Sequence, residues 1–229
     1  MEATHLADHA TDYAVVEQEP PEVLARNLVS AGQLLASATA FFFVAFVFAY
    51  FYLESLNNNH EWKPKGVDTA VGWGVAITAC FVASATLVRL GLLDHRAERR
   101  DAWRVKGGAA LALGLAGLVL QAVAWTQQGF GPADGAFASV YVGWTAFQFL
   151  FVVATLYWLE TTLAMSLRYR PLPIASSPAP GEASGDPHRT AHDIDDPLSL
   201  ARAELSALSF YWTFLAGLAV VSFVILYLL

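Results

Sequence analysis

Long apolar runs separated by short polar segments dominate this chain. Five such runs are present, and they cover approximately residues 28–53, 69–93, 105–125, 136–167 and 205–229. Each is at least as long as the roughly 20 residues that an α-helix needs to cross the hydrocarbon core of a bilayer. Backbone groups in lipid must be hydrogen-bonded internally, and the strands of a barrel would be shorter and alternating. The pattern therefore predicts an all-α integral membrane bundle of five transmembrane helices.

The polar segments between the runs differ in composition. Residues 1–27 are acidic and lack the positively charged start and early apolar core of a signal peptide. Residues 57–68 form a polar loop, residues 95–106 a basic loop and residues 129–135 a tight turn. The expected organisation is a polar N-terminal segment (1–27), four transmembrane helices (28–170), a Pro/Ser-rich cytoplasmic linker (171–204) and a fifth transmembrane helix (205–229).

Composition supports a location in the membrane. Hydrophobic residues make up 56% of the chain and charged residues only 14%, whereas about a quarter of the residues of a soluble globular chain are charged. The formal net charge is −7, and no basic groove with interleaved aromatic residues is present, so nucleic acid is not an expected partner. Cys80, the single cysteine, lies in an apolar run, where we expect a small packed side chain.

The basic residues predict how the bundle is oriented. If the N-terminus is cytoplasmic, eleven of the thirteen lie on the cytoplasmic side and two, Lys63 and Lys65, lie outside. The eleven are Arg26, Arg89, Arg96, Arg99, Arg100, Arg104, Lys106, Arg168, Arg170, Arg189 and Arg202. Cytoplasmic loops of membrane proteins carry an excess of Lys and Arg. The N-terminus is therefore expected in the cytoplasm and the C-terminus outside.

Small residues recur at intervals of four in two of the runs. They are Gly72, Ala76, Cys80 and Ser84 in the second run, and Gly108, Ala112 and Ala116 in the third. Residues four apart share one face of a helix, and small side chains let two backbones approach closely in lipid. We expect each of these faces to pack against a neighbouring helix, and the two helices against each other.

The histidines offer no ligands for a buried metal or haem. All six (His5, His9, His60, His95, His188 and His192) fall in the polar segments. Haem and metal centres in bundles need imidazole, thiolate or carboxylate groups that converge from facing helices. Phosphate-binding loops, nucleophile elbows and zinc-protease motifs are also missing from the sequence. We therefore predict no catalytic, cofactor-binding or metal site on this chain.

A few polar residues inside the runs are candidates for function. Glu160, eight residues before Arg168, is the most deeply placed acid, about 12 Å from that end at ~1.5 Å per residue. It is a candidate for a proton-linked role, or for a bond to a neighbouring helix or a lipid headgroup. Gln33, Gln121 and Gln148 can cross-link helices or bind a substrate, and we favour the structural interpretation.

Two further charged features belong to the membrane surface. Glu54 ends the first run and is expected to be interfacial. The basic loop carries a cluster that can attract anionic lipid headgroups, each charge contributing on the order of 1 kcal/mol near the surface. The cluster consists of Arg96, Arg99, Arg100, Arg104 and Lys106. The same residues also act as determinants of topology.

Several local patterns in their order along the chain resemble subunit III of the haem–copper terminal oxidases, the cytochrome c oxidase type. The pattern from Leu34 to Ser37, followed by Phe41 to Phe43 and Ala49 to Tyr52, resembles the third helix of that family. The stretch Leu120–Ala122, then Gly129, Phe130, Tyr141 and Phe147, is similar to its fifth and sixth helices. The sequence Tyr211-Trp212-Thr213-Phe214 resembles a motif of its last helix. The likeness covers roughly residues 30–229.

The chain departs from the family pattern at named positions. The glutamate that usually follows the serine of the third helix falls at Ala38, so its proton-handling role is not carried over. Two histidines of the sixth helix fall at Gln148 and Phe151, and a histidine and an aspartate of the last helix fall at Thr213 and Ala216. The first two helices of the family are absent, as in its shorter five-helix bacterial members.

The resemblance implies an accessory, non-redox subunit of a bacterial terminal oxidase in aerobic respiration. Such a subunit binds structural phospholipid, stabilises the complex and supports sustained turnover. Haem and copper are then expected in partner subunits I and II, and a cytochrome bc complex is a further partner if a supercomplex forms. This chain is neither of those partners, because the copper site of subunit II needs two cysteines and the haems of subunit I need intramembrane histidines.

Three other functions stay open from the sequence. An accessory protein of a nitric-oxide reductase system would share the fold. A small transporter is less favoured, because the chain has no internal repeat and no proline inside a run. An unfamiliar membrane enzyme that uses Glu160 is the third.

Overall fold

The computed structural model describes residues 21–57, 62–168 and 197–229, and these form a bundle of five long helices. The helices are α1 (Pro21–Ser55), α2 (Val71–Arg96), α3 (Arg100–Gln127), α4 (Ala136–Arg168) and α5 (Pro197–Phe223), followed by the π-helical turn η1 (Val224–Leu228). No strand occurs among the described residues. Each of the five helices is long and apolar enough to cross a membrane. The chain is therefore an all-α, multi-pass membrane protein, as the apolar runs predicted.

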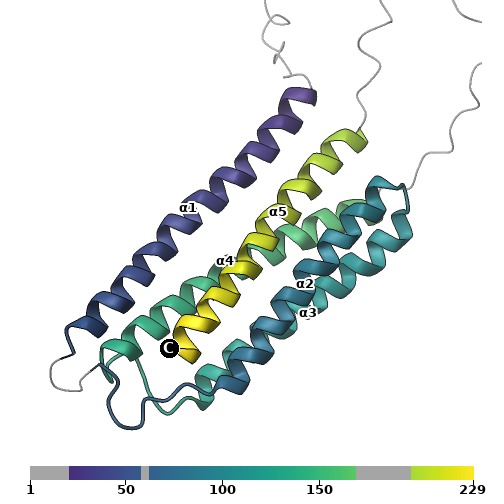
Figure 1. Cartoon of the computed structure of the whole chain (residues 1–229). Helices are drawn as coiled ribbons and strands as arrows, with labels where there is room; N and C mark the ends of the chain where they lie inside the picture. The colour runs from purple at the N-terminus through teal and green to yellow at the C-terminus, as the bar shows by residue number, and fades with distance from the viewer. Residues whose placement is uncertain (1–20, 58–61, 169–196) are drawn as a thin grey trace, which may run out of the picture.

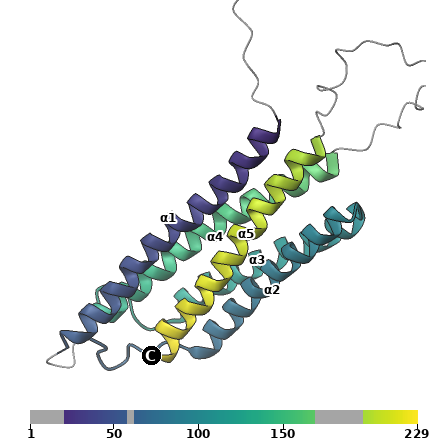
Figure 2. The same cartoon turned by 45° about the horizontal axis from the view of Figure 1, so that its top comes forward.

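The last helix of the chain lies between the first and the second (Figure 1). Helix α5 packs against α1, α2 and α4, while α2 packs against α3, α3 against α4, and α4 against α1. The view from a second direction shows the same order, with α5 between α1 and α2 (Figure 2). Helix α5 therefore contacts three of the other four helices of the bundle.

The two ends of the bundle differ in charge. Helices α1, α3 and α5 begin at one end, which we call the basic end, and α2 and α4 end there (Figure 1). Arg26, Arg89 and Arg202 belong to this end, together with the basic cluster between α2 and α3. The opposite end, which we call the loop end, carries Lys63 and Lys65. This segregation is the one that the positive-inside prediction requires.

Several helices extend beyond the apolar runs. Helix α1 begins at Pro21 and α5 at Pro197, so residues 21–27 and 197–204 are helical rather than part of a polar segment or linker. Proline suits the first turn of a helix, where its missing N–H has no partner to lose. Helices α2 and α3 leave only residues 97–99 between them, because Arg, Lys, Ala and Glu are good helix formers. Residues 1–20 and 169–196 lie outside the described part of the chain.

Glycines, rather than the predicted small-residue faces, mediate the closest helix packing. Helices α2 and α3 do pack on each other, as predicted, but Gly72, Ala112 and Ala116 are exposed. The buried stripe of α3 is instead Gly107, Ala110, Gly114 and Gly117. A Cβ atom at Gly117 would lie 2.5 Å from the ring of Phe81 on α2. The helix pair was predicted correctly, and Ser84 of the predicted α2 face is buried against α3. The contacting face of α3 was predicted wrongly, because large side chains of neighbouring helices pack opposite its glycines.

The loop end is closed by an aromatic cluster. Trp62, from the segment before α2, lies 5.0 Å from Tyr50 and 5.6 Å from Phe137 between ring centroids, with edge-to-face geometry. The Phe137 backbone N–H donates to the Trp62 carbonyl oxygen at 3.1 Å. The Lys63 ammonium lies 4.8 Å from the centre of the Phe137 ring. These contacts hold the described part of the loop after α1 against the start of α4.

Candidate functional site

Polar side chains on α5 form hydrogen bonds to the helices around it. The Tyr211 hydroxyl pairs with that of Thr39 on α1 at 3.0 Å. The Trp212 indole N–H donates to Ser84 Oγ on α2 at 3.0 Å, and the Ser84 hydroxyl donates to the Ala110 carbonyl of α3 at 2.6 Å. Ser84 is fully buried. One continuous set of hydrogen bonds thus connects α5, α2 and α3 in the middle of the bundle.

A second set of bonds connects α5 to α4. The Trp144 indole N–H donates to Ser222 Oγ at 2.7 Å. Nearer the basic end, Trp158 Nε1 and Thr162 Oγ1 donate to the Glu204 carboxylate at 3.2 and 3.1 Å. Glu204 was not considered from the sequence, because it fell in the predicted linker just before the fifth apolar run. An acid within about four residues of such a boundary, next to helix-forming residues, is the signal that would have found it.

These bonds are typical of a structural scaffold. Interhelical hydrogen bonds in membranes contribute about 0.6 kcal/mol each on average, and they fix which faces of the helices meet. Indole and hydroxyl donors that are paired in this way are not directed at an open site. The α5 contacts therefore account for the polar groups of Tyr211, Trp212 and Glu204 without requiring a substrate.

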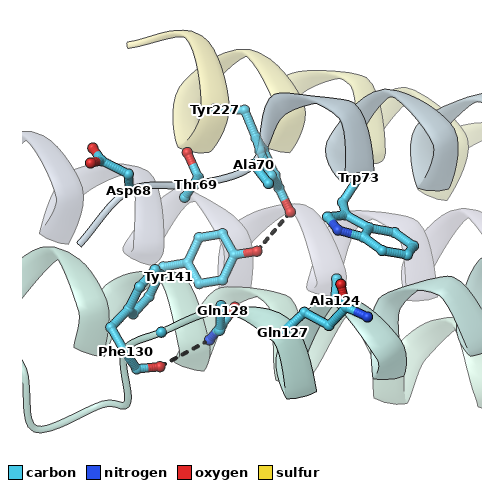
Figure 3. Close-up of a pocket in the computed structure, with 11 residues that line it drawn as sticks. Asp68, Thr69, Ala70, Trp73, Ala124, Gln127, Gln128, Phe130, Tyr141 and Tyr227 are labelled. Atoms are coloured by element: carbon cyan, nitrogen blue, oxygen red, sulfur yellow. Dashed lines mark hydrogen bonds between the residues drawn. The ribbon is translucent and has the colours of Figure 1, made fainter. Parts of the chain in front are cut away.

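A pocket lies at the loop end of the bundle. It has a volume of about 260 Å³ and lies between the segment before α2, the end of α3, the start of α4 and η1 (Figure 3). The residues that line it are Asp68, Thr69, Ala70, Trp73, Ala124, Gln127, Gln128, Gly129, Phe130, Tyr141 and Tyr227. Polar and aromatic side chains line this pocket. Trp144 and Trp212, which form interhelical hydrogen bonds, are not among the lining residues.

The hydroxyl groups of two tyrosines meet at the inner side of this pocket. Tyr141 and Tyr227 are 2.7 Å apart between their oxygens, and Figure 3 shows the pair next to Trp73 and Gln127. The Gln128 amide Nε2 donates to the Phe130 carbonyl oxygen at 3.5 Å. The Gln128 Oε1 atom is buried and accepts no hydrogen bond from the described residues. Gln128 therefore lines the pocket, but its carbonyl oxygen is buried away from the open space and has no partner among the residues that the structure describes.

A smaller cavity lies between α2, α3, α4 and α5. Its volume is about 20 Å³, and Gln121, Gln148, Thr145 and Ser222 are among its lining residues. Gln121 is only 7% exposed, and its Nε2 has no partner among the described residues. A cavity of that size holds about one water molecule. The structure thus brings two of the three predicted glutamines together, while Gln33 is exposed on α1.

Glu160 is separate from all of these groups. Its side chain is exposed on the outer surface of α4, near Tyr157, which is 68% exposed. The buried face of this part of α4 is formed by Leu156 and Leu159. The carboxylate is therefore directed away from Gln121 and Gln148, toward lipid or a partner. Glu54 is likewise exposed, in the last turn of α1.

At the basic end, a buried carboxylate forms ion pairs with two residues of the basic cluster. Asp94 on α2 is 5% exposed, accepts a hydrogen bond from Lys106 Nζ and lies 3.3 Å from Arg99 Nη2. Arg104 pairs with Asp101 at 3.3 Å and donates to the Ser166 carbonyl of α4 at 2.7 Å. Three members of the predicted lipid-binding cluster therefore have partners in the protein. Arg96 and Arg100 lie in the last turn of α2 and at the start of α3.

The positions that carry the family resemblance occupy different environments. Tyr211, Trp212, Tyr141 and Phe130 are buried and hold helices together. The ring of Phe214 stacks on Tyr211 at 6.2 Å. The remaining two are more exposed: Ser37 bonds to its own helix at 3.0 Å, and Phe147 is 42% exposed beside Phe42.

The described residues contain no group of three or more His, Cys, Asp or Glu side chains placed to hold a metal ion. His95, expected in a loop, lies in the last turn of α2. The other five histidines, His5, His9, His60, His188 and His192, lie outside the described residues. Cys80 is a partly buried free thiol.

No protein-family model matches the chain, and no curated protein matches it.

Proposed function

We propose that this chain is an accessory, non-redox subunit of a haem–copper terminal oxidase in the plasma membrane of a bacterium, similar to subunit III of that family. Its partners would be the catalytic subunits I and II, which would carry haem and copper. In this role the chain stabilises the complex, binds lipid and sustains turnover during aerobic respiration. The proposal also admits a cytochrome bc complex as a neighbour in a supercomplex.

One observation supports the proposal: indole, hydroxyl and carboxylate groups of α5 form hydrogen bonds to α1, α2 and α4. Tyr211 and Trp212 belong to the motif that resembles the last helix of the family, and they make two of these bonds. A subunit that positions a catalytic neighbour needs a rigid bundle of this kind and does not need ligands for a redox centre. The outward position of Glu160 leaves a polar group available to such a neighbour.

Purification of the tagged full-length chain from its own membranes in a mild detergent tests this proposal. We expect haem absorbance to co-purify with the chain, together with oxygen consumption from a reduced donor. The matched control is the same tagged chain produced alone in a host that lacks its partner subunits, from which no haem absorbance is expected.

Two results would contradict the proposal. Recovery of the chain from its own membranes without any haem protein would remove the oxidase partner. Stoichiometric haem or copper in the chain produced alone would show that it holds a redox centre itself. If the co-purified complex consumes nitric oxide rather than oxygen, the accessory role stands but belongs to a nitric-oxide reductase system.

A further inference from the structure

The outer side of α4 carries a carboxylate among apolar side chains. Tyr157 is 68% exposed, and Glu160, one turn further along the helix, is exposed as well. Leu150 and Val153, which precede Tyr157 by two turns and one turn, are 59% and 40% exposed. Residues at these intervals share one side of a helix. We call this set of four residues the α4 face.

Contacts between α3 and α4 show how deep Glu160 lies in the bundle. Two close contacts bracket it along α4, and the pairs are Leu156 with Gly114 and Leu163 with Gly107. Because the two helices are antiparallel, Glu160 is level with the stretch of α3 around Ala110. The Ala110 carbonyl belongs to the hydrogen bonds in the middle of the bundle, within the third apolar run. Glu160 therefore lies at the depth of the hydrocarbon rather than of the headgroups.

The described part of the chain gives Glu160 no counter-charge. Its carboxylate forms no ion pair and no hydrogen bond with any described residue. Arg104, the basic residue of α3 that reaches α4, pairs instead with Asp101 and donates to the Ser166 carbonyl. Ser166 follows Glu160 by six residues, which is about 9 Å along a helix. Charged groups inside a membrane usually pair with one another, so a basic group from outside this chain is the expected partner.

A second copy of this chain is a poor partner for the α4 face. Copies in one membrane insert in the same orientation, so a closed two-fold pair has its axis along the membrane normal and brings one surface against itself. The α4 face would then place Glu160 of one copy near Glu160 of the other. Like charges that face each other disfavour a contact. A helix of a different chain avoids this repulsion.

From the depth, exposure and missing counter-charge of Glu160, we propose that the α4 face binds a transmembrane helix of a different chain that carries a lysine, arginine or histidine. The basic group pairs with the Glu160 carboxylate, while Leu150, Val153 and the Tyr157 ring pack against the apolar side of that helix. The inference rests on the proposed function for the presence of a membrane partner, and it adds the surface and the chemistry by which that partner binds.

Photo-cross-linking of the full-length chain in its own membranes tests the surface. Benzoylphenylalanine would replace Tyr157 in one variant and Phe41 in the other, because Phe41 is an aromatic residue that is 80% exposed on α1. At position 157 we expect an adduct with a membrane protein other than this chain. Mass spectrometry should map the adduct to a transmembrane helix with a basic residue within about one turn, or four residues, of the cross-link. At position 41 we expect adducts with lipid.

Charge variants test the ion pair. Glu160→Gln keeps the size of the side chain and removes its charge, and it should lower the yield of the co-purified partner about three- to tenfold. Glu54→Gln removes an exposed carboxylate from the last turn of α1 and should leave the yield unchanged. Glu160→Lys should lose the partner, and replacement of the partner's basic residue by glutamate should restore it. Thermal unfolding of the isolated Glu160→Gln chain should match that of the unmodified chain, because Glu160 has no described partner within it.

The two proposals fail in different ways. A cross-linked partner that belongs to a complex without haem contradicts the oxidase proposal and leaves the α4 face as the binding surface. Haem that co-purifies with the chain while position 157 cross-links only lipid overturns the α4 face alone. The α4 face is also overturned if position 157 cross-links a second copy, if the mapped helix has no basic residue, or if Glu160→Gln and Glu54→Gln retain the partner equally. Loss of stability in the isolated Glu160→Gln chain, or failure of the charge reversal to restore the partner, has the same consequence.

Discussion

Asp94 illustrates how one residue determines the structure of the basic end. Its carboxylate is buried, and two cations from the turn after α2 and from α3 pair with it. The backbone reinforces this arrangement, because the Arg99 N–H donates to the Asp94 carbonyl oxygen at 2.9 Å. A single acid therefore fixes the three-residue turn that joins two antiparallel helices.

We predict that Asp94→Asn destabilises the bundle by about 1–2 kcal/mol, because the change leaves Lys106 and Arg99 without their counter-charge and both cations are partly in water. The matched control is Asp101→Asn. The Asp101 side chain is 95% exposed in its pair with Arg104, so the loss should be below about 0.5 kcal/mol. Unfolding in a detergent titration measures the loss of stability in each variant. Equal losses would show that the Asp94 ion pairs contribute no more than the exposed pair of Asp101.

At the scale of the helices, packing depends on where glycine stands opposite a large side chain. On α3, Gly117 faces Phe81 of α2, and Gly107 faces Leu163 of α4. At Gly108, the next residue after Gly107, a Cβ atom would have no neighbouring side chain within 4 Å. Helices in lipid gain stability from such close contact, because burial of apolar groups there brings no hydrophobic gain.

The variants Gly117→Ala and Gly108→Ala should therefore change stability in opposite directions. Alanine favours a helix by up to about 1 kcal/mol over glycine at either position. At Gly108 we expect this gain alone. At Gly117 the added methyl group would meet the buried Phe81 ring, and overpacking should cost about 1–3 kcal/mol more. Unfolding free energies of the two variants in the same detergent give the comparison, and equal values would contradict the close contact of α2 and α3.

At the scale of the whole molecule, charge predicts the orientation of the bundle, and α5 packs against three of the other helices. The described basic residues of the helix ends lie at the end where α1 begins, and the C-terminal turn η1 lies at the loop end (Figure 1). The positive-inside rule predicts that the chain inserts with the basic end in the cytoplasm.

Cysteine labelling in intact cells tests this orientation. In a Cys80→Ala background, we expect a membrane-impermeant maleimide to label Ala133→Cys at the loop end. The same reagent should label Ala97→Cys, in the turn at the basic end, only after the cells are permeabilised. Both positions are exposed, so accessibility within the bundle does not limit the reaction. The reverse pattern of labelling would contradict the predicted topology.

The number and type of the membrane segments could be predicted from the sequence because each follows from a local property. An apolar run of about 20 residues in lipid has to be helical, whatever its neighbours are. The contacting faces could not be predicted in this way. In water, hydrophobic periodicity marks the buried side of a helix, but a membrane helix is apolar on every side. Gly108 and Gly117 therefore looked equivalent, although only one faces an aromatic ring.

The sequence by itself determined five helical spans, the segregation of the basic residues and the absence of imidazole from the apolar runs. Only the tertiary structure decided that α5 lies between α1 and α2 and that Glu160 faces outward. It also decided that Gln121 and Gln148 line one cavity, and that Gln128 Oε1 is buried without a partner among the described residues. The physical reason is that span formation depends on each segment's own transfer into lipid. The partners of a polar group depend instead on side chains that are distant along the chain and are brought close by packing.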